Sequence, residues 1–387
     1  MENKSLSYCR YGLAGFLSVC MLLLFLKSPV WAADSYSVTQ WNRELQALES
    51  LGRKAGTEIE TEQNVQTGAE YLPASYDPRQ EQMVTPVRDQ RDLALCWDYA
   101  GIALMESALL RKGYRGADVD LSELHGAYAA YWLQADGSSF SQFCRRTNTR
   151  TALFEASLAG MGPVPEAEVP MRQITDAYVL PEQELYRQRY KVLSVSTYPL
   201  ADTDACKRQI LQTGGLMISY YSYGLYYRDQ AKGGDTSYYF PYATGSLNHT
   251  VEVVGWDDTY KAAYFVKTPQ KDGAWLAKNS WGQKGYNGAG SGFYWISYED
   301  GSLKKQLALS VQMSGKLVQD KLQAADSSRQ EEKREEEEKV ISDPPPTWEE
   351  RKECAGWQMP VIEEIKPGRK YAVRDRLSMQ RKLVNRF

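Results

Sequence analysis

The chain has 387 residues, of which 43% are hydrophobic and 25% are charged. This length allows one large domain or two ordinary ones, with a substantial core. The formal net charge of −3 gives no general reason to expect nucleic-acid binding, and 27 tyrosines with 10 tryptophans argue against a largely disordered chain.

The first segment, residues 1–32, has the pattern of a secretory signal peptide. A positively charged start precedes the apolar run Leu13–Leu26, and Val30 and Ala32 are the small residues of a cleavage site. The apolar run is shorter than the roughly 20 residues of a membrane-spanning helix. We therefore predict cleavage after Ala32 and a secreted or cell-surface protein with no membrane span after cleavage. An uncleaved anchor is the alternative.

Changes in composition divide the rest of the chain. Residues 33–70 are polar with weak helical patterning, which predicts a short propeptide or N-terminal arm. Aromatic and β-branched clusters alternate with glycine-rich turns in the predicted folded domain, residues 71–315. A charged linker, 316–346, ends in three prolines, and a basic tail, 347–387, follows. We predict a poorly ordered tail, with contact to an anionic cell surface as the alternative.

Helices and strands alternate within the folded domain. "WDYAGIALMESALLRKG" (Trp97–Gly113) and "DACKRQILQTGG" (Asp204–Gly215) predict helices that end in glycine. "HTVEVVGW" (His249–Trp256) and "AYFVK" (Ala263–Lys267) predict strands. The mixture indicates an α+β domain.

Outside the signal segment the chain has four cysteines, Cys96, Cys144, Cys206 and Cys354. Four cysteines in a chain of this length do not form a disulfide scaffold. No CxxC pair occurs, so the sequence does not indicate a thiolate zinc site. A Cys144–Cys206 disulfide is compatible with an oxidising compartment, and the sequence leaves it open.

Cys96 lies where a charged segment turns into the first predicted helix. The first turn of a helix favours a thiolate, although most free cysteines are small buried hydrophobic residues. The chain has only two histidines. His125 lies in a helical pattern and is interpreted as structural, whereas His249 begins an apolar strand. Asn279 follows another strand, and its amide oxygen could accept a hydrogen bond from an imidazole.

The blocks Gln90, Cys96-Trp97, His249 and "NSWG" (Asn279–Gly282) occur in the order found in the papain-like cysteine protease family, and the chain resembles its bacterial exported members. The resemblance runs from about Leu72 to Asp300. It implies an α+β, papain-like two-lobe fold, with a helical left lobe, an antiparallel β-barrel-like right lobe and the active-site cleft between them.

The resemblance also implies a role for each matching residue. Cys96 would attack the scissile carbonyl as a thiolate, and His249 would donate a proton to the leaving amine. Asn279 would orient the imidazole, and Gln90 would help to stabilise the oxyanion together with the Cys96 backbone N–H. Trp281 would cover the hydrogen bond between the histidine and the asparagine, and Trp97 would be a second supporting residue. The mechanism requires no cofactor and no metal.

The sequence departs from the family pattern in three places. The loop Arg91–Leu95 has no glycine, which could narrow the cleft. Asp98 replaces a usual alanine, and we expect a small effect because it should point away from the cysteine. The family's substrate-binding glycine pair is missing, with Thr147-Asn148 in its place, and Leu93 stands where a disulfide partner of Cys144 would be.

These observations predict an exported cysteine endopeptidase that hydrolyses peptide bonds of a peptide or protein substrate. The alternative is a catalytically weak papain-fold protein that binds peptides or a protein partner. A cell-wall amidase or transpeptidase of another fold is disfavoured by the "NSWG" block and the spacing of Gln90. The sequence does not indicate which side chain the substrate pocket prefers.

Overall fold

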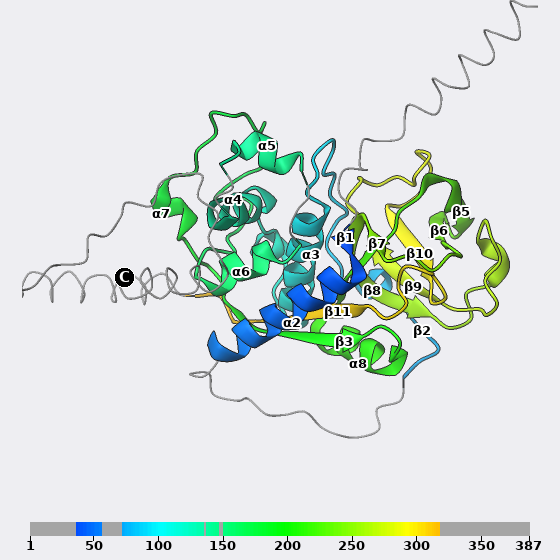
Figure 1. Cartoon of the computed structure of the whole chain (residues 1–387). Coiled ribbons are helices and arrows are strands. Elements are labelled where there is room, and N and C mark those ends of the chain that lie inside the picture. Colours follow the sequence, from blue (N-terminus) through cyan, green and yellow to red (C-terminus); the bar gives the residue numbers. More distant parts are fainter. Residues whose placement is uncertain (1–35, 56–71, 135–136, 147–149, 318–387) are drawn as a thin grey trace, which may run out of the picture.

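The computed structural model describes residues 36–55, 72–134, 137–146 and 150–317 (Figure 1). Helices gather on one side of the molecule and most strands on the other, so the predicted α+β class is confirmed. The predicted signal peptide, most of the charged linker and the basic tail lie outside the described residues.

The helices are mostly short, apart from two longer ones in the first third of the chain. They are α2 (Val38–Ala55), α3 (Cys96–Arg111), α4 (Glu123–Gln134), α5 (Phe140–Cys144), α6 (Ala152–Leu158), α7 (Glu182–Leu185) and α8 (Thr203–Thr213). Single 3-10 turns are η1 (Pro78–Glu81), η2 (Gly116–Val119), η3 (Gly224–Tyr226) and η4 (Ala262–Tyr264).

Most strands belong to one sheet of nine, in the order β3-β11-β4-β8-β9-β10-β6-β5, with β2 paired to β8. Their bounds are β2 (Ser75–Tyr76), β3 (Val192–Pro199), β4 (Leu216–Tyr220), β5 (Tyr227–Lys232), β6 (Asp235–Tyr238), β8 (His249–Asp257), β9 (Ala274–Lys278), β10 (Phe293–Ser297) and β11 (Leu307–Met313). All pairs are antiparallel except β10 with β6. The strands in the described ranges do not close into a barrel, so this part of the β-rich lobe is an open sheet.

Helix α3 lies at the centre of the molecule and is buried from Cys96 to Leu110. It packs on β8 and β11 of the sheet and on α4 and α6 of the helical lobe. A helix that is covered on all sides is apolar all round rather than amphipathic. This packing fixes Cys96 at the junction between the helices and the sheet.

The structure agrees with three of the four predicted elements and corrects one. Helix α8 ends at Gly214, whose φ of 98° is left-handed and whose Cα lies too close to the Ser107 carbonyl to carry a side chain. The predicted strand Ala263–Lys267 is wrong, because η4 and a loop occupy this stretch. Instead of pairing in the sheet, this stretch buries the Phe265 ring against Tyr260, with the ring centroids 5.3 Å apart.

The N-terminal arm, residues 36–55, packs on the domain. Its helix α2 contacts β3, β11 and α6, and the Trp41 indole is buried and donates to the Leu307 carbonyl at 2.7 Å. Ahead of it, β1 (Tyr36–Ser37) pairs antiparallel with β7 (Ser246–Leu247). The arm therefore reaches the chain segment that leads directly into His249.

Within the described ranges, no helix is both long enough and apolar enough to cross a membrane.

Candidate active site

Cys96 is the first residue of α3, and its side chain is buried. Burial raises the pKa of the thiol, while the nearby Arg150 guanidinium, hydrogen bonds with Thr250 and the Trp97 backbone N–H act in the opposite direction. The helix N-terminus and the Arg150 guanidinium favour the thiolate, whereas burial of the sulfur favours the neutral thiol. In this arrangement the cysteine is shielded and held near its neutral form.

The loop before Cys96 makes its turn without glycine. Arg91 takes a left-handed conformation, with φ of 54°, and its backbone N–H donates to the Asp89 carboxylate at 2.9 Å. Such a turn costs a non-glycine residue roughly 1–2 kcal/mol, which the local hydrogen bond offsets in part. The Ala94 N–H donates to the Cys144 carbonyl at 2.7 Å. Tertiary contacts thus hold the loop where related proteins use glycine.

Gln90 is fully buried and joined to the "NSWG" block. Its backbone N–H donates to the Ser280 carbonyl at 2.8 Å, and its Oε1 accepts from the Ser280 hydroxyl. Its Nε2 donates to the Leu93 carbonyl at 2.6 Å. A primary amide has two N–H donors, so one of them remains for a substrate oxygen. The orientation of the amide is fixed from both ends.

His249 and Asn279 form a direct hydrogen bond, 2.7 Å from Nε2 to Oδ1. The Ser280 backbone N–H also donates to this Oδ1 at 2.9 Å, which fixes the asparagine with its oxygen toward the ring. The imidazole therefore carries its proton on Nε2, and Nδ1 can accept. Burial lowers the pKa of His249 to about 4, against the opposing effect of the hydrogen bond to Asn279.

Two tryptophans flank this arrangement. Trp281 stacks on the His249 ring, with centroids 4.6 Å apart and an interplanar angle of 28°, and shields it from solvent on that side. Trp97 packs edge-on against Phe143 at 6.2 Å, within the core of the helical lobe. Trp281 therefore contacts the imidazole directly, whereas Trp97 packs the start of α3 into the core.

The structure brings the four predicted residues together in two linked groups. Gln90 contacts Ser280, next to Asn279, while the Cys96 thiol contacts Thr250, next to His249. No hydrogen bond joins the Cys96 thiol to the His249 ring in the part of the chain that is described. Catalytic hydrogen bonds are often long without substrate and tighten in the complex.

Two further residues at the site were not identified from the sequence. Arg150 is buried beside Cys96, and the Tyr36 ring of the arm lies over its guanidinium, 4.7 Å from Cζ to the ring centroid. Neither stands in a motif, because Arg150 follows other arginines in a polar stretch and Tyr36 lies in a segment of weak patterning. Tyr36 and Arg150 are 114 positions apart in the sequence, so only the folded chain brings them into contact.

The other titratable residues discussed from the sequence lie away from this centre. His125 is buried in α4, and its Nε2 lies 3.1 Å from the Glu184 carbonyl oxygen. Asp98 is buried against Gly126 of α4, and burial, with the nearby Glu123, raises the pKa of its carboxyl group well above the usual value. The Asp98 carboxyl is not among the groups that shift the pKa of the Cys96 thiol, in agreement with the small effect expected.

The described cysteines are unbonded. Cys96, Cys144 and Cys206 are all free and buried. Cys144 belongs to the core of the helical lobe and Cys206 to a core beneath the sheet, so the Cys144–Cys206 disulfide left open by the sequence is not formed. Cys354 lies outside the described residues.

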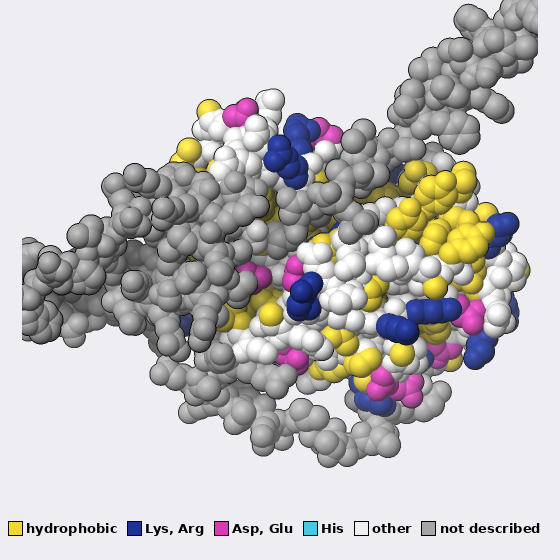
Figure 2. Space-filling model, viewed as in Figure 1, with side chains coloured by type: hydrophobic (Ala, Val, Ile, Leu, Met, Phe, Trp, Pro, Cys, Tyr) yellow, Lys and Arg dark blue, Asp and Glu magenta, His cyan; other side chains and the backbone are white. Residues whose placement is uncertain are grey.

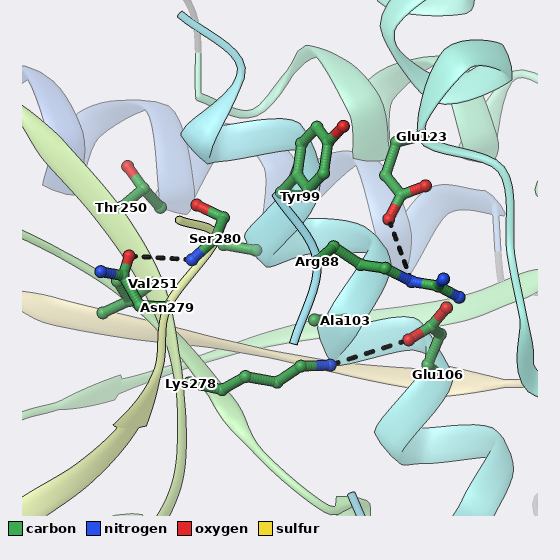
Figure 3. A pocket seen from close by; sticks show the side chains of 11 residues that line it. Arg88, Tyr99, Ala103, Glu106, Glu123, Thr250, Val251, Lys278, Asn279 and Ser280 are labelled. Carbon is green, nitrogen blue, oxygen red and sulfur yellow. Dashed lines mark hydrogen bonds and ion pairs between the residues drawn. The ribbon is translucent and has the colours of Figure 1, made fainter. Parts of the chain in front are cut away.

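A buried group of charges lies behind the site, around a cavity of about 10 Å³ (Figure 3). Lys278 of β9 lies 3.8 Å from the Glu106 carboxylate of α3, and Arg88 lies 3.9 Å from Glu123 of α4. Asn279 and Ser280 line the same cavity, with their backbone-to-side-chain hydrogen bond at its edge. The charges connect the helical lobe to β9, the strand that precedes Asn279.

Hydrophobic side chains gather on the surface of the β-rich lobe (Figure 2). The large exposed hydrophobic residues of this lobe include Tyr223, Leu225 and Tyr242. The Ser222 backbone N–H donates to the Asn248 side chain at 2.6 Å, which ties the start of this segment to the residue before His249. An aromatic surface therefore adjoins the candidate site.

Metal chemistry has no obvious ligand set here. In the described ranges there is no group of three or more His, Cys, Asp or Glu side chains that could hold a metal ion.

Comparison with known proteins gives consistent results. A family profile described as papain family cysteine protease matches residues 72–310. The chain is 27% identical over 233 residues to the senescence-specific cysteine protease SAG12 of Arabidopsis thaliana, covering 57% of this chain and 56% of that protein. The match thus spans little more than half of this curated relative.

Two solved structures of one clostridial protein are also similar. One is the cysteine protease Cwp84 after propeptide cleavage, with 26% identity and a TM-score of 0.52, covering 62% of this chain and 58% of that one. The other contains the cysteine protease and lectin-like domains of Cwp84, described as a surface layer associated protein of Clostridium difficile. It has 26% identity and a TM-score of 0.53, covering 65% of this chain and 54% of that one.

Proposed function

Because the chain belongs to the papain family of cysteine proteases, we propose that it is an exported cysteine endopeptidase whose nucleophile is Cys96. The observation that carries the proposal is the hydrogen bond from His249 Nε2 to Asn279 Oδ1, with Cys96 held against the next residue, Thr250. A proton acceptor oriented by a third group, beside a cysteine at a helix N-terminus, is the arrangement that nucleophilic catalysis needs.

In the proposed reaction, His249 Nδ1 takes the proton of the Cys96 thiol, and the thiolate sulfur attacks the carbonyl carbon of the peptide bond. The carbonyl π electrons move to the oxygen, where the free Gln90 N–H and the Cys96 backbone N–H stabilise the charge. The C–N bond breaks as the imidazolium gives its proton to the leaving amine. Water then attacks the thioester, with His249 as base, and releases the acid and the thiol.

Asn279 and Trp281 would support this sequence without touching the reacting atoms. The amide oxygen of Asn279 keeps Nε2 protonated and the ring in place. The stacked Trp281 excludes water from that bond, and a low-dielectric surrounding strengthens it. Each would therefore affect the rate through His249.

Export is proposed on the signal pattern of residues 1–32. The surface-layer description of Cwp84 is consistent with a secreted or cell-surface location for this chain. We also propose the organisation predicted from the sequence: an arm at 33–70, a peptidase domain at 71–315, a charged linker at 316–346 and a basic tail at 347–387, with contact between the tail and an anionic cell surface as the alternative.

One observation favours the alternative, a papain-fold protein that binds peptides but cleaves them weakly. Cys96 is fully buried, and burial raises the pKa of its thiol. Tyr36 of the N-terminal arm lies over Arg150, the cation that acts on this thiol. We therefore propose that the Cys96 thiol is weakly reactive while the N-terminal arm is packed on the domain.

A labelling experiment distinguishes the endopeptidase from the peptide-binding protein. The full chain is treated with a peptidyl epoxysuccinate or vinyl sulfone under reducing conditions. The endopeptidase predicts stoichiometric modification at Cys96 that is lost in His249→Ala and retained in the buried-histidine control His125→Gln. No modification between pH 5 and 8, in folded protein with the arm docked or displaced, would favour the binding protein.

A further inference from the structure

Arg150 is a buried cation without a counter-charge. Its side chain is 2% exposed, and its guanidinium donates only to neutral oxygens: the hydroxyls of Ser219 and Thr250 and the Leu247 carbonyl. Its Nε has no hydrogen-bond acceptor. No carboxylate of the described ranges lies within ion-pair distance of it. Burying a charge is costly unless it is paired, so this position calls for an anion.

The guanidinium lies next to the candidate nucleophile. Thr250 contacts both the Arg150 guanidinium and the Cys96 thiol. The positive charge of Arg150 also shifts the pKa of the Cys96 thiol downward, against the effect of burial. A group bound to Arg150 would therefore be separated from the Cys96 sulfur by the Thr250 side chain alone.

The N-terminal arm now covers Arg150. The Tyr36 ring lies over the guanidinium, and its hydroxyl donates to Glu44, whose negative charge also acts on Arg150. The backbone of the arm is extended here, because β1 pairs with β7 and the Val38 N–H donates to the Gly245 carbonyl at 2.8 Å. An extended chain added at a strand edge is a common mode of peptide binding. The arm thus brings an extended backbone and an acidic side chain to this place.

We propose that Arg150 is a specificity-determining residue that binds an acidic side chain of the substrate beside Cys96. The proposal rests on the proposed peptidase function. A guanidinium with free donors binds a carboxylate by charge-assisted, often paired hydrogen bonds. A neutral side chain in the same place leaves the buried cation unpaired, so discrimination should be strong. The arm must move aside before the substrate takes this position.

The test uses peptide libraries in which one position at a time carries Glu, Gln, Asp, Asn or Leu. It is run on the full chain and on Tyr36→Ala, which removes the covering ring. At one position, we expect kcat/KM for Glu to exceed that for Gln by about tenfold or more, and the ratio to fall as salt rises. In Arg150→Met the ratio should drop to about one or below, and in Arg150→Lys it should remain above one.

Because the Glu/Gln ratio is taken within each variant, it is independent of any general change in Cys96 reactivity. Arg228→Met is the matched control, because Arg228 is exposed on β5 and, among the described residues, its side chain hydrogen-bonds to the Ala263 carbonyl. A wild-type ratio near one at every position, or an acidic preference unchanged in folded Arg150→Met, overturns the proposal. If Arg150→Met does not fold, the Glu/Gln ratio of kcat/KM in the wild-type chain and its decrease with salt still test the proposal.

Failure of the peptidase function is distinguished by a binding measurement. In a Cys96→Ser background, fluorescent peptides that differ only by Glu or Gln are titrated into the Tyr36→Ala protein with and without Arg150→Met. If the Glu peptide binds more tightly only when Arg150 is present, the anion site is supported. If the protein that retains Cys96 does not cleave the same peptide, the peptidase function is rejected while the anion site stands. Equal binding of the two peptides rejects the anion site.

Discussion

At the scale of single residues, Asn279 has the most closely defined role. Its Oδ1 accepts from the His249 ring at 2.7 Å and from the Ser280 backbone N–H at 2.9 Å. The second bond prevents the amide from turning its nitrogen toward the ring. The asparagine thereby selects the tautomer that leaves His249 Nδ1 free to accept a proton. In the proposed reaction this role is one of positioning, because Asn279 would act only through the histidine.

Asn279→Ala should therefore lower kcat/KM by about ten- to a hundredfold, the loss expected when one hydrogen bond to a charged imidazolium is removed. Cys96 should still be alkylated by iodoacetamide, and KM should change little. Steady-state kinetics on an active substrate measure the effect, with the exposed Asn287→Ala as control. A variant as active as the control would show that His249 is oriented by other contacts.

At the scale of elements, the N-terminal arm packs on the domain and lies over Arg150 of the candidate site. Helix α2 is held on β11 by the buried Trp41, whose indole donates to the Leu307 carbonyl, and by Asn42, whose side-chain oxygen accepts from the Leu307 N–H at 2.9 Å. In the described part of the arm, β1 with its residue Tyr36 reaches the site. Anchoring and covering are thus done by different parts of the arm.

Trp41→Ala should loosen the arm, because truncating a buried tryptophan costs about 3–5 kcal/mol. We expect Cys96 to react with iodoacetamide severalfold faster, since both the burial of the thiol and the ring over Arg150 are lost. Mass spectrometry of the alkylated peptide against time gives the rate. Gln46→Ala, an exposed change on the same helix, is the control. An unchanged rate would show that the arm does not limit access to Cys96.

At the scale of the whole molecule, buried charges join the helical lobe to the sheet (Figure 3). Glu106 accepts from the Leu121 N–H at 3.0 Å and lies near Lys278. Glu123 has less support, with Arg88 at 3.9 Å. Burial, reinforced by the nearby Glu106 charge, raises the pKa of Glu123 to about 8. This carboxyl group therefore keeps its proton near neutral pH in the folded protein and loses it on unfolding.

The raised pKa predicts how stability changes with pH. Below about pH 4.5 the carboxyl is protonated in both states, and between 4.5 and 8 it is protonated only in the folded state. The stability that Glu123 contributes is thus present at low pH and is lost as the pH rises to 8. Glu123→Gln removes this loss, so the free energy of unfolding of the variant relative to wild type should rise by about 2–4 kcal/mol across that range.

Urea unfolding of wild type and Glu123→Gln at pH 4.5, 6, 7 and 8 measures this difference, and the exposed Glu182→Gln is the control. The comparison between variants cancels the pH effects of other buried groups, such as His125 and His249, whose pKa values are lowered to about 4. A difference that does not change with pH would contradict the raised pKa of Glu123.

Local patterns in the sequence determined the fold class, the start of α3 at Cys96, the start of β8 at His249 and the strand before Asn279. These features depend on hydrophobic periodicity and on residue types at fixed spacing, which are local properties. The family resemblance added Gln90, six positions before the cysteine. The strand assigned to Ala263–Lys267 failed because an apolar run does not show whether a strand or a loop buries its side chains, and here Phe265 is buried from a loop.

Tertiary structure alone decided what surrounds the thiol. The glycine-free loop turns through a left-handed Arg91, and Arg150 is brought beside Cys96 from a polar stretch with no motif. The arm places Tyr36 over that arginine, and the charge of Glu123 is set by burial among other charges. Each of these depends on distances between residues far apart in the chain, and the energy of a buried charge depends on those distances rather than on spacing along the sequence.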